Sequence, residues 1–98
     1  MVNGPPISES ATVSVTDRQV ACVVADETVI LQLHEGMYYG LNAVGTCVWR
    51  SVQSSCCVGQ IVDAVLAEFD VERDRCLADV CELLEEMHLH QLVTVSAS

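Results

Sequence analysis

The side chains best suited to chemistry in this sequence are cysteines and histidines. Both can ligate metal ions, and cysteines can also form disulfides. They are Cys22, Cys47, Cys56, Cys57, Cys76, Cys81, His34, His88 and His90. A structural zinc site draws its ligands from short spacings such as Cys-x-x-Cys, and no such pair occurs here. We therefore expect no metal ion and no other cofactor, and we expect the thiols to pack as small apolar groups in the core.

The residue pattern also argues against catalysis. The sequence has no nucleophile with a neighbouring base, no paired carboxylates at a credible cleft and no glycine-rich phosphate loop. Cys57 is the most reactive candidate, because a thiol at the N-terminus of a helix can have a lowered pKa and we expect a helix to begin there. The sequence predicts a binding protein rather than an enzyme.

The charge of the chain limits its partners. The 98 residues include 14 acidic side chains against four basic ones, and the formal net charge is −10. This charge repels the phosphate backbone of nucleic acids and favours a neutral or basic partner. The apolar runs are too short to span a membrane, and the first ten residues do not resemble a signal peptide. We expect a cytoplasmic protein, in which reducing conditions argue against disulfides.

The elements that must position a binding site meet at residues 37–49. Here the spacing of the apolar residues changes from that of a strand to that of a helix. Up to Leu41 the apolar residues alternate, as on a strand, and beyond it they recur every three to four positions, as on a helix. Asn42 lies at the change, and its side chain is suited to accept a hydrogen bond from the first helical turn. Gly45 has no side chain in that turn, so another group can approach the helix closely.

Three apolar runs before the helix predict an antiparallel meander, at residues 19–25, 28–34 and 37–41. Gly36 can take the positive φ that the turn before the third strand requires. On that strand Met37, Tyr39 and Leu41 share a face that we assign to the core, and Tyr38 points outward. The edges of such a sheet present unpaired backbone groups.

Three helices are predicted next, at about residues 43–52, 57–69 and 72–91. The third helix has two apolar stripes, roughly 90° apart. The first stripe consists of Leu77, Cys81, Leu84 and His88, and the second of Cys76, Val80, Leu83 and Met87. Either the helix packs between the sheet and another helix, or the second stripe lines a groove beside the third strand. In the second case Val80→Asp should weaken ligand binding without unfolding the domain. Normal binding by this variant, together with unfolding of Leu84→Asp, would contradict the assignment of the two stripes.

The chain is predicted to be one α+β domain with short ends. We expect a flexible N-terminal arm at residues 1–17, the folded domain at residues 18–95 and a frayed C-terminus at residues 96–98. Within the arm, the alternation of Ala11, Val13 and Val15 allows either a short edge strand or an extended arm. Residues 92–95 can return as a last short extended segment.

The junction carries a Y-x-L-N-x-x-G-x-x-x-W pattern, formed by Tyr39, Leu41, Asn42, Gly45 and Trp49. This pattern resembles the PqqD family, the leader-binding domains also called RiPP recognition elements, and the resemblance extends over about residues 20–93. It implies a winged helix-turn-helix fold in which a three-stranded antiparallel sheet is followed by three helices. The chain departs from the family at the start of the second helix, where a cysteine replaces the expected Thr or Ser cap.

A single mode of recognition fits these features. An extended peptide can pair with the free edge of the third strand while its apolar side chains enter a groove along the third helix. The resemblance implies that this peptide is the leader of a ribosomally synthesised precursor. By the same resemblance, the leader contacts Met37, Tyr38, Tyr39, Gly40, Leu41, Cys76, Asp79, Val80, Leu83 and Met87.

Within the family, the chain resembles the stand-alone B1 proteins of lasso-peptide pathways. This similarity implies that the domain delivers the captured precursor to a leader peptidase, the B2-type protease, and that a macrocyclase acts afterwards. The alternative within the family is the carrier of pyrroloquinoline quinone biosynthesis.

The alternative of another class is a winged-helix DNA-binding protein. Its recognition helix would need basic or amide side chains along its exposed face. After Arg75 the third helix offers Asp79, Glu82, Glu85 and Glu86 instead, which argues against DNA.

Overall fold

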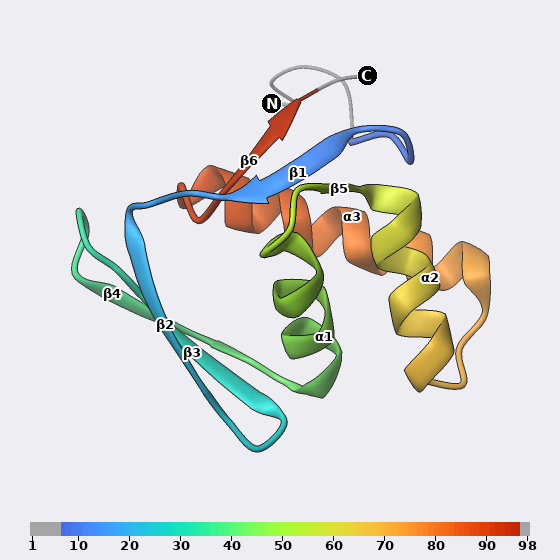
Figure 1. Cartoon of the computed structure of the whole chain (residues 1–98), viewed down its shortest axis with the longest axis horizontal. Helices are drawn as coiled ribbons and strands as arrows, with labels where there is room; N and C mark the ends of the chain where they lie inside the picture. The colour runs from blue at the N-terminus through green and yellow to red at the C-terminus, as the bar shows by residue number, and fades with distance from the viewer. Residues whose placement is uncertain (1–6, 97–98) are drawn as a thin grey trace.

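The computed structural model describes residues 7–96, which form an α+β fold of three helices and two small antiparallel sheets (Figure 1). The helices are α1 (Ala43–Val52), α2 (Val58–Glu68) and α3 (Arg73–Leu89). The strands are β1 (Thr12–Val15), β2 (Gln19–Val24), β3 (Glu27–Gln32), β4 (Met37–Leu41), β5 (Cys56–Cys57) and β6 (Val93–Ser96). Within the described residues, no helix is long and apolar enough to cross a membrane.

Strands β2, β3 and β4 form the predicted antiparallel meander, in that spatial order. The turn into β4 contains Gly36, whose φ of 71° is the left-handed value expected of it. Ile30 and Tyr39 lie opposite each other on the face of the sheet that packs against α1. The meander stands on one side of the three helices (Figure 1).

The prediction that one face of β4 packs on the core is correct at one end of the strand and wrong at the other. Tyr39 and Leu41 pack against the core, and Tyr38 points outward as expected. Met37, however, is 54% exposed. The reason is that α1 leaves the sheet directly after Leu41 and covers that end of the strand, whereas Met37 lies at the far end beside the turn.

The second sheet, β5-β1-β6, differs from the prediction. Strand β1 is its middle strand rather than an edge strand or an extended arm, because β5 and β6 pair with it on either side. Ala11 and Val13 are buried in the core. Strands therefore precede, interrupt and follow the helices, so the order is more mixed than one sheet followed by three helices. The domain boundaries at 17/18 and 95/96 stay predictions, and residues 1–6 and 97–98 lie outside the described residues.

Helix α1 begins as the sequence predicts. The side chain of Asn42 accepts a hydrogen bond from the backbone N–H of Gly45 at 2.9 Å, which satisfies a donor without an intrahelical partner. The buried Thr28 hydroxyl donates to the Thr46 hydroxyl at 2.8 Å and links β3 to the helix. Trp49 and Val52 are buried on the face of α1 that joins the core.

Helix α2 begins one residue after Cys57, which occupies the cap position as expected. The Gln60 side chain accepts a hydrogen bond from the Cys57 backbone N–H at 3.0 Å. This reciprocal bond, typical of a capping box, supports the start of the helix although the cap residue is a thiol.

Helix α3 has one fully buried stripe, and it combines members of both predicted stripes. Cys76, Val80, Leu84 and Met87 are buried, whereas Leu77, Cys81 and Leu83 are half-buried and His88 is exposed. The helix packs against α2, and β6 lies along it as well. The wide apolar sector of α3 therefore serves two neighbours, a helix and the second sheet.

The six cysteines are free thiols, and their surroundings differ. Burial raises the pKa of the Cys47 thiol to about 11, and a hydrogen bond of 3.3 Å to the Glu68 carboxylate adds to this effect. Burial likewise raises the pKa of Cys56, Cys76 and Cys81. Cys22 is exposed on β2, so the expectation of core packing is wrong for this residue.

The cap of α1 gives a first prediction. Asn42→Ala should lower the free energy of unfolding by about 1 kcal/mol, because the Gly45 N–H loses its partner. Urea unfolding measures this change, and Asn42→Asp, which keeps the acceptor, is the matched control. Equal stability of the alanine variant and the wild type would contradict this role of the cap.

The buried thiol gives a second prediction. Well below pH 9 the Cys47 thiol is protonated in both the folded and the unfolded chain, so it contributes no pH dependence to stability there. As the pH rises from 9 toward 11, unfolded chains release this proton and folded chains keep it, so the free energy of unfolding should fall.

Urea unfolding under reducing conditions at about pH 8 and about pH 10.5 should therefore show a smaller decline for Cys47→Ala than for the wild type. An equal decline in both proteins would assign the effect to other groups.

Candidate functional site

Strand β4 is an edge strand. It pairs with β3 on one side, and in the described part of the chain no strand pairs with its other side. Its outer edge therefore presents backbone N–H and C=O groups in the spacing of a strand. Such an edge can accept another extended segment.

Three adjoining hollows lie between β4, α1 and α3, and we call them together the groove. Leu83 lines all three hollows. The central hollow connects the other two, because it shares Val44 and Asp79 with one and Gly40 and Leu41 with the other. The groove thus extends from the hairpin strand β4 along α3 toward α2.

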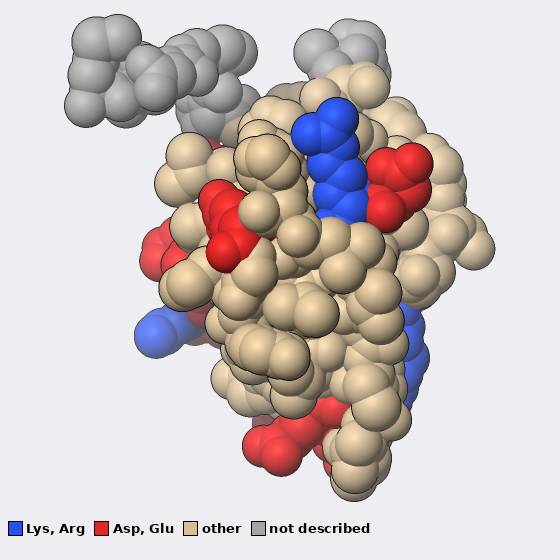
Figure 2. All heavy atoms as spheres, turned by 90° about the vertical axis from the view of Figure 1, so that its left-hand side faces the viewer, with Lys and Arg blue, Asp and Glu red and all other residues tan. Residues whose placement is uncertain are grey.

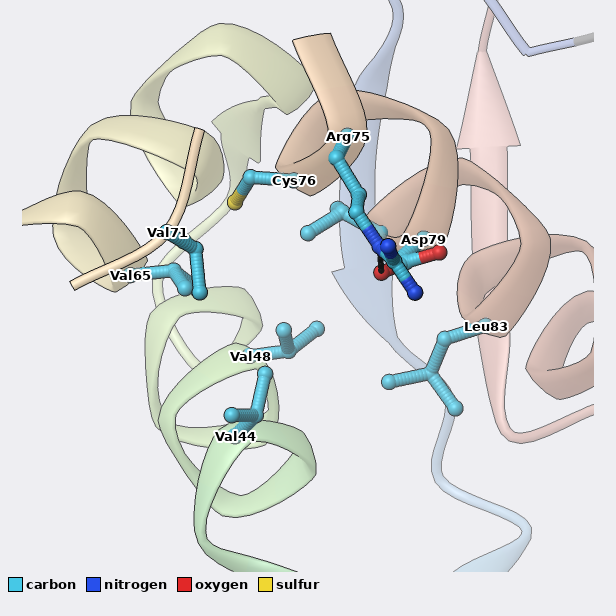
Figure 3. A pocket seen from close by; sticks show the side chains of 9 residues that line it. Val44, Val48, Val65, Val71, Arg75, Cys76, Asp79 and Leu83 are labelled. Carbon is cyan, nitrogen blue, oxygen red and sulfur yellow. Dashed lines mark ion pairs between the residues drawn. The ribbon is translucent and has the colours of Figure 1, made fainter. Parts of the chain in front are cut away.

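The apolar hollow, of about 120 Å³, is the end of the groove between the three helices (Figure 3). Its apolar lining consists of Val44, Val48, Val65, Val71, Cys76, Val80 and Leu83. The exposed side chains of Arg75 and Asp79 lie on one side of it and form an ion pair of 3.9 Å. This combination suits an aliphatic side chain that enters the hollow from a segment passing beside the two charges.

The aromatic hollow, of about 130 Å³, is the end of the groove beside β4. Tyr39 and His90 form one side, with ring centroids 4.8 Å apart. The Tyr39 hydroxyl donates to the Glu35 carboxylate at 3.0 Å and lies 2.9 Å from Nδ1 of His90. A hydroxyl has one hydrogen, so His90 completes this network when its Nδ1 carries a proton and donates to the Tyr39 oxygen.

This network also keeps the tyrosine neutral. Burial raises the pKa of the Tyr39 hydroxyl, and the hydrogen bond and the negative charge of Glu35 raise it further, with a contribution from the Glu86 carboxylate. A neutral hydroxyl holds the Tyr39 ring in place as a rigid wall of the aromatic hollow. Glu86 itself lines this hollow and gives it an acidic margin.

Most of the predicted contact residues come together at the groove. Tyr39, Gly40, Leu41, Cys76, Asp79, Val80, Leu83 and Met87 line one or more of the three hollows. Met37 and Tyr38 line none of them, because Met37 lies beyond the groove and Tyr38 points to the opposite face of the sheet. Their backbone nevertheless belongs to the open edge of β4.

Several lining residues were not predicted from the sequence. They are Asn42, Val44, Gly45, Val48, Val65, Val71, Arg75, Glu86, His90 and Leu92. For Val44 and Val48 the apolar stripe of α1 was a visible signal, but periodicity alone does not show whether such a stripe faces the core or a groove. Val65 lies on α2 and Leu92 in the connection between α3 and β6, and tertiary packing brings both beside the groove.

The charges near the groove are unfavourable for nucleic acid. Arg73 at the start of α3 is paired with Glu9 at 2.6 Å and with Asp63 at 3.1 Å, and Arg75 is paired with Asp79. The remaining exposed part of α3 carries acidic side chains. In residues 7–96, no three His, Cys, Asp or Glu side chains cluster in a way that could hold a metal ion.

Comparisons with known proteins give one family and two similar structures. The sequence matches the family described as coenzyme PQQ synthesis protein D (PqqD) over residues 27–93. A solved structure of TbiB1 in complex with the TbiA(beta) leader peptide is 32% identical, with a TM-score of 0.79 over 87% of this chain and 99% of that chain.

A lasso peptide synthetase B1 complexed with the leader peptide shares the fold, at 15% identity and a TM-score of 0.73 over 84% of this chain and 96% of that chain. A search of functionally curated proteins gives no significant match.

The burial of Val80 changes the expected effect of its substitution. This side chain lines the groove but is only 2% exposed, so Val80→Asp places an unpaired charge in the core rather than at a surface. We therefore expect this variant to lose stability as well as binding, in contrast to the expectation from the sequence alone. Val80 forms the floor of the apolar hollow, and its neighbour Leu83 is the half-buried residue that a ligand would contact.

We predict that Val80→Asp lowers the free energy of unfolding by about 3 kcal/mol or more, whereas Leu83→Asp lowers it by about 1 kcal/mol or less. Urea unfolding of the two variants checks this difference, since the substitution is the same and only the burial differs. Equal losses of stability would contradict the assignment of Leu83 to the wall of the groove.

Proposed function

The chain belongs to the PqqD family, and from this premise we propose that it binds the leader segment of a ribosomally synthesised precursor peptide. The observation that carries the proposal is the position of an open strand edge directly beside an apolar groove. The likeness to TbiB1, a protein solved in complex with a leader peptide, supports the same function.

In the proposed complex the leader adds a strand to β4. Main-chain hydrogen bonds to the edge contribute about 1 kcal/mol each and do not depend on the leader sequence. Alternate side chains of the added strand point toward the groove, because side chains alternate between the two faces of a strand. The edge thus supplies affinity, and the hollows select the side chains.

The chemistry of the hollows defines the preferred leader. An aliphatic side chain fits the apolar hollow, and a ring or a second apolar side chain fits against Tyr39 and His90. Asp79 and Glu86 place negative charge along the groove, so neutral or basic residues should flank these positions in the leader. The contact residues are proposed to be those predicted on β4 and α3, joined by Val44 of α1.

The domain is proposed to act as a recognition element and not as an enzyme. It would deliver the captured precursor to a leader peptidase, after which a macrocyclase closes the product. We also retain a winged helix-turn-helix description of the fold, with α2 and α3 as the two helices, and a cytoplasmic location. Both are proposals that follow from the family and from the sequence.

The alternative within the family is a carrier for pyrroloquinoline quinone biosynthesis, and the description of the matching family model favours it. The 32% identity to TbiB1 over nearly all of that chain favours the lasso-peptide function. A DNA-binding function is disfavoured, because the exposed part of α3 is acidic and both Arg73 and Arg75 are already paired with carboxylates.

The proposal is tested by titrating the domain with the leader half of the precursor encoded beside it and recording backbone amide shifts by NMR. We expect saturable binding, with the largest shifts along β4, at the start of α1 and along the groove side of α3. Leu83→Asp should weaken binding at least tenfold, because Leu83 lines every hollow.

Leu89→Asp is the matched control, since Leu89 is 74% exposed, lies on the same helix and lines none of the three hollows. This variant should bind the leader normally. Absence of leader binding by the wild-type domain, together with retention of a DNA duplex at low salt, would contradict the proposed function.

A further inference from the structure

The face of the meander opposite the groove is apolar and uncovered. We call it the outer face, and its large side chains are Val20, Val24, Val29, Leu31, Leu33 and Tyr38. Val20, Leu31 and Tyr38 lie side by side across the three strands. Val20, Val29 and Tyr38 are 58%, 47% and 69% exposed, so no described part of the chain packs over them.

This composition is unusual for the solvent side of an antiparallel sheet. When one face packs on a core, the other normally carries polar side chains. Here the polar side chains Thr28 and Gln32 are buried on the inner face, and their neighbours Val29 and Leu33 are exposed. Exposed apolar side chains that adjoin one another, with charged groups around them, mark interaction surfaces on soluble proteins.

Charged groups surround the outer face but leave its centre free. Figure 2 views this side of the molecule and shows a largely uncharged middle with charged side chains toward its margins. Residues 17–41 contain four acidic side chains, Asp17, Asp26, Glu27 and Glu35, and one basic side chain, Arg18, which gives a formal charge of −4 + 1 = −3. The margin therefore attracts a partner with basic groups.

A second copy of this chain fits the outer face poorly. Two copies would each carry a net charge of −10 and would bring their acidic margins together. An occupant whose own margin is basic would instead complement the acidic side chains around the face.

From these observations we propose that the outer face docks a partner protein whose contact surface is apolar at its centre and rimmed by Lys and Arg. The inference rests on the proposed function, because this partner would be the enzyme to which the captured leader is delivered. The partner and the leader would then occupy opposite faces of the same strand, β4.

The geometry of strand addition couples the two binding events. A leader paired with β4 extends the sheet by one strand, and its alternate side chains point toward the groove and toward the outer face. A partner on the outer face would therefore contact the outward side chains of the leader as well as Tyr38. The domain would present the precursor to the enzyme as part of one continuous sheet surface.

The test uses the full chain loaded with leader peptide and the purified leader peptidase encoded beside it. Val29→Glu places a charge at the centre of the outer face without touching the groove. We expect its affinity for the leader to stay within twofold of the wild type and its affinity for the peptidase to fall at least tenfold. Titration calorimetry measures both affinities with the same preparations.

Two further variants keep the result interpretable if Val29→Glu fails to fold. Glu27→Lys reverses a charge in the exposed β2–β3 turn region and should weaken peptidase binding at least threefold, because it repels a basic rim. Leu89→Glu makes the same apolar-to-acidic change on α3, away from the outer face, and should leave both affinities unchanged.

The possible failures are distinguishable. Normal leader binding together with wild-type peptidase affinity in Val29→Glu and Glu27→Lys would overturn this inference and leave the proposed function intact. A wild-type dimer that Val29→Glu dissociates would also overturn it, because the face would then serve self-association. Absence of leader binding by the wild-type chain would overturn the proposed function and this inference with it.

Discussion

The direct junction between β4 and α1 is the constraint on which the site depends. A single residue, Asn42, separates the last residue of the strand from the first residue of the helix, and its side chain closes the first helical turn. A Cβ on Gly45 would lie 3.0 Å from the Cβ of Leu41, so glycine permits the strand to run against the helix. The edge of β4 is therefore held at a fixed position beside α1. The groove exists because neither element can swing away from the other.

The floor of the groove belongs at the same time to the hydrophobic core. Cys76, Val80 and Met87 are buried and support both the packing of α3 and the hollows above them. Ligand selection can therefore vary mainly at the half-buried wall, where Leu83 lies, and at the charged margin. This division explains how a domain of fewer than one hundred residues can keep its stability while its binding preference changes.

The meander has two apolar faces with different neighbours. Its inner face packs against α1, and its outer face meets solvent. The strong negative charge of the chain is compatible with such an exposed face, because it keeps separate copies apart while it attracts basic partners. Cys22 lies two residues after Val20 on β2 and opposite Val29 on β3, so it belongs to the outer face, and it is the one exposed cysteine among residues 7–96.

The sequence by itself determined the elements whose signals are local. Alternation predicts the meander, the change of period at Asn42 predicts the start of α1, and Gly36 predicts the turn before β4, because each depends on the preferences of a few neighbouring residues. Only the tertiary structure decided which apolar face is covered. Periodicity placed Met37 in the core, although it is exposed, and it did not show that Val80 is buried beneath the groove. Strand β1 became the middle strand of a sheet because β5 and β6, which follow much later in the chain, pair with it on either side. Burial is a property of the assembled layers, whereas the period of a strand or a helix is already present in the chain.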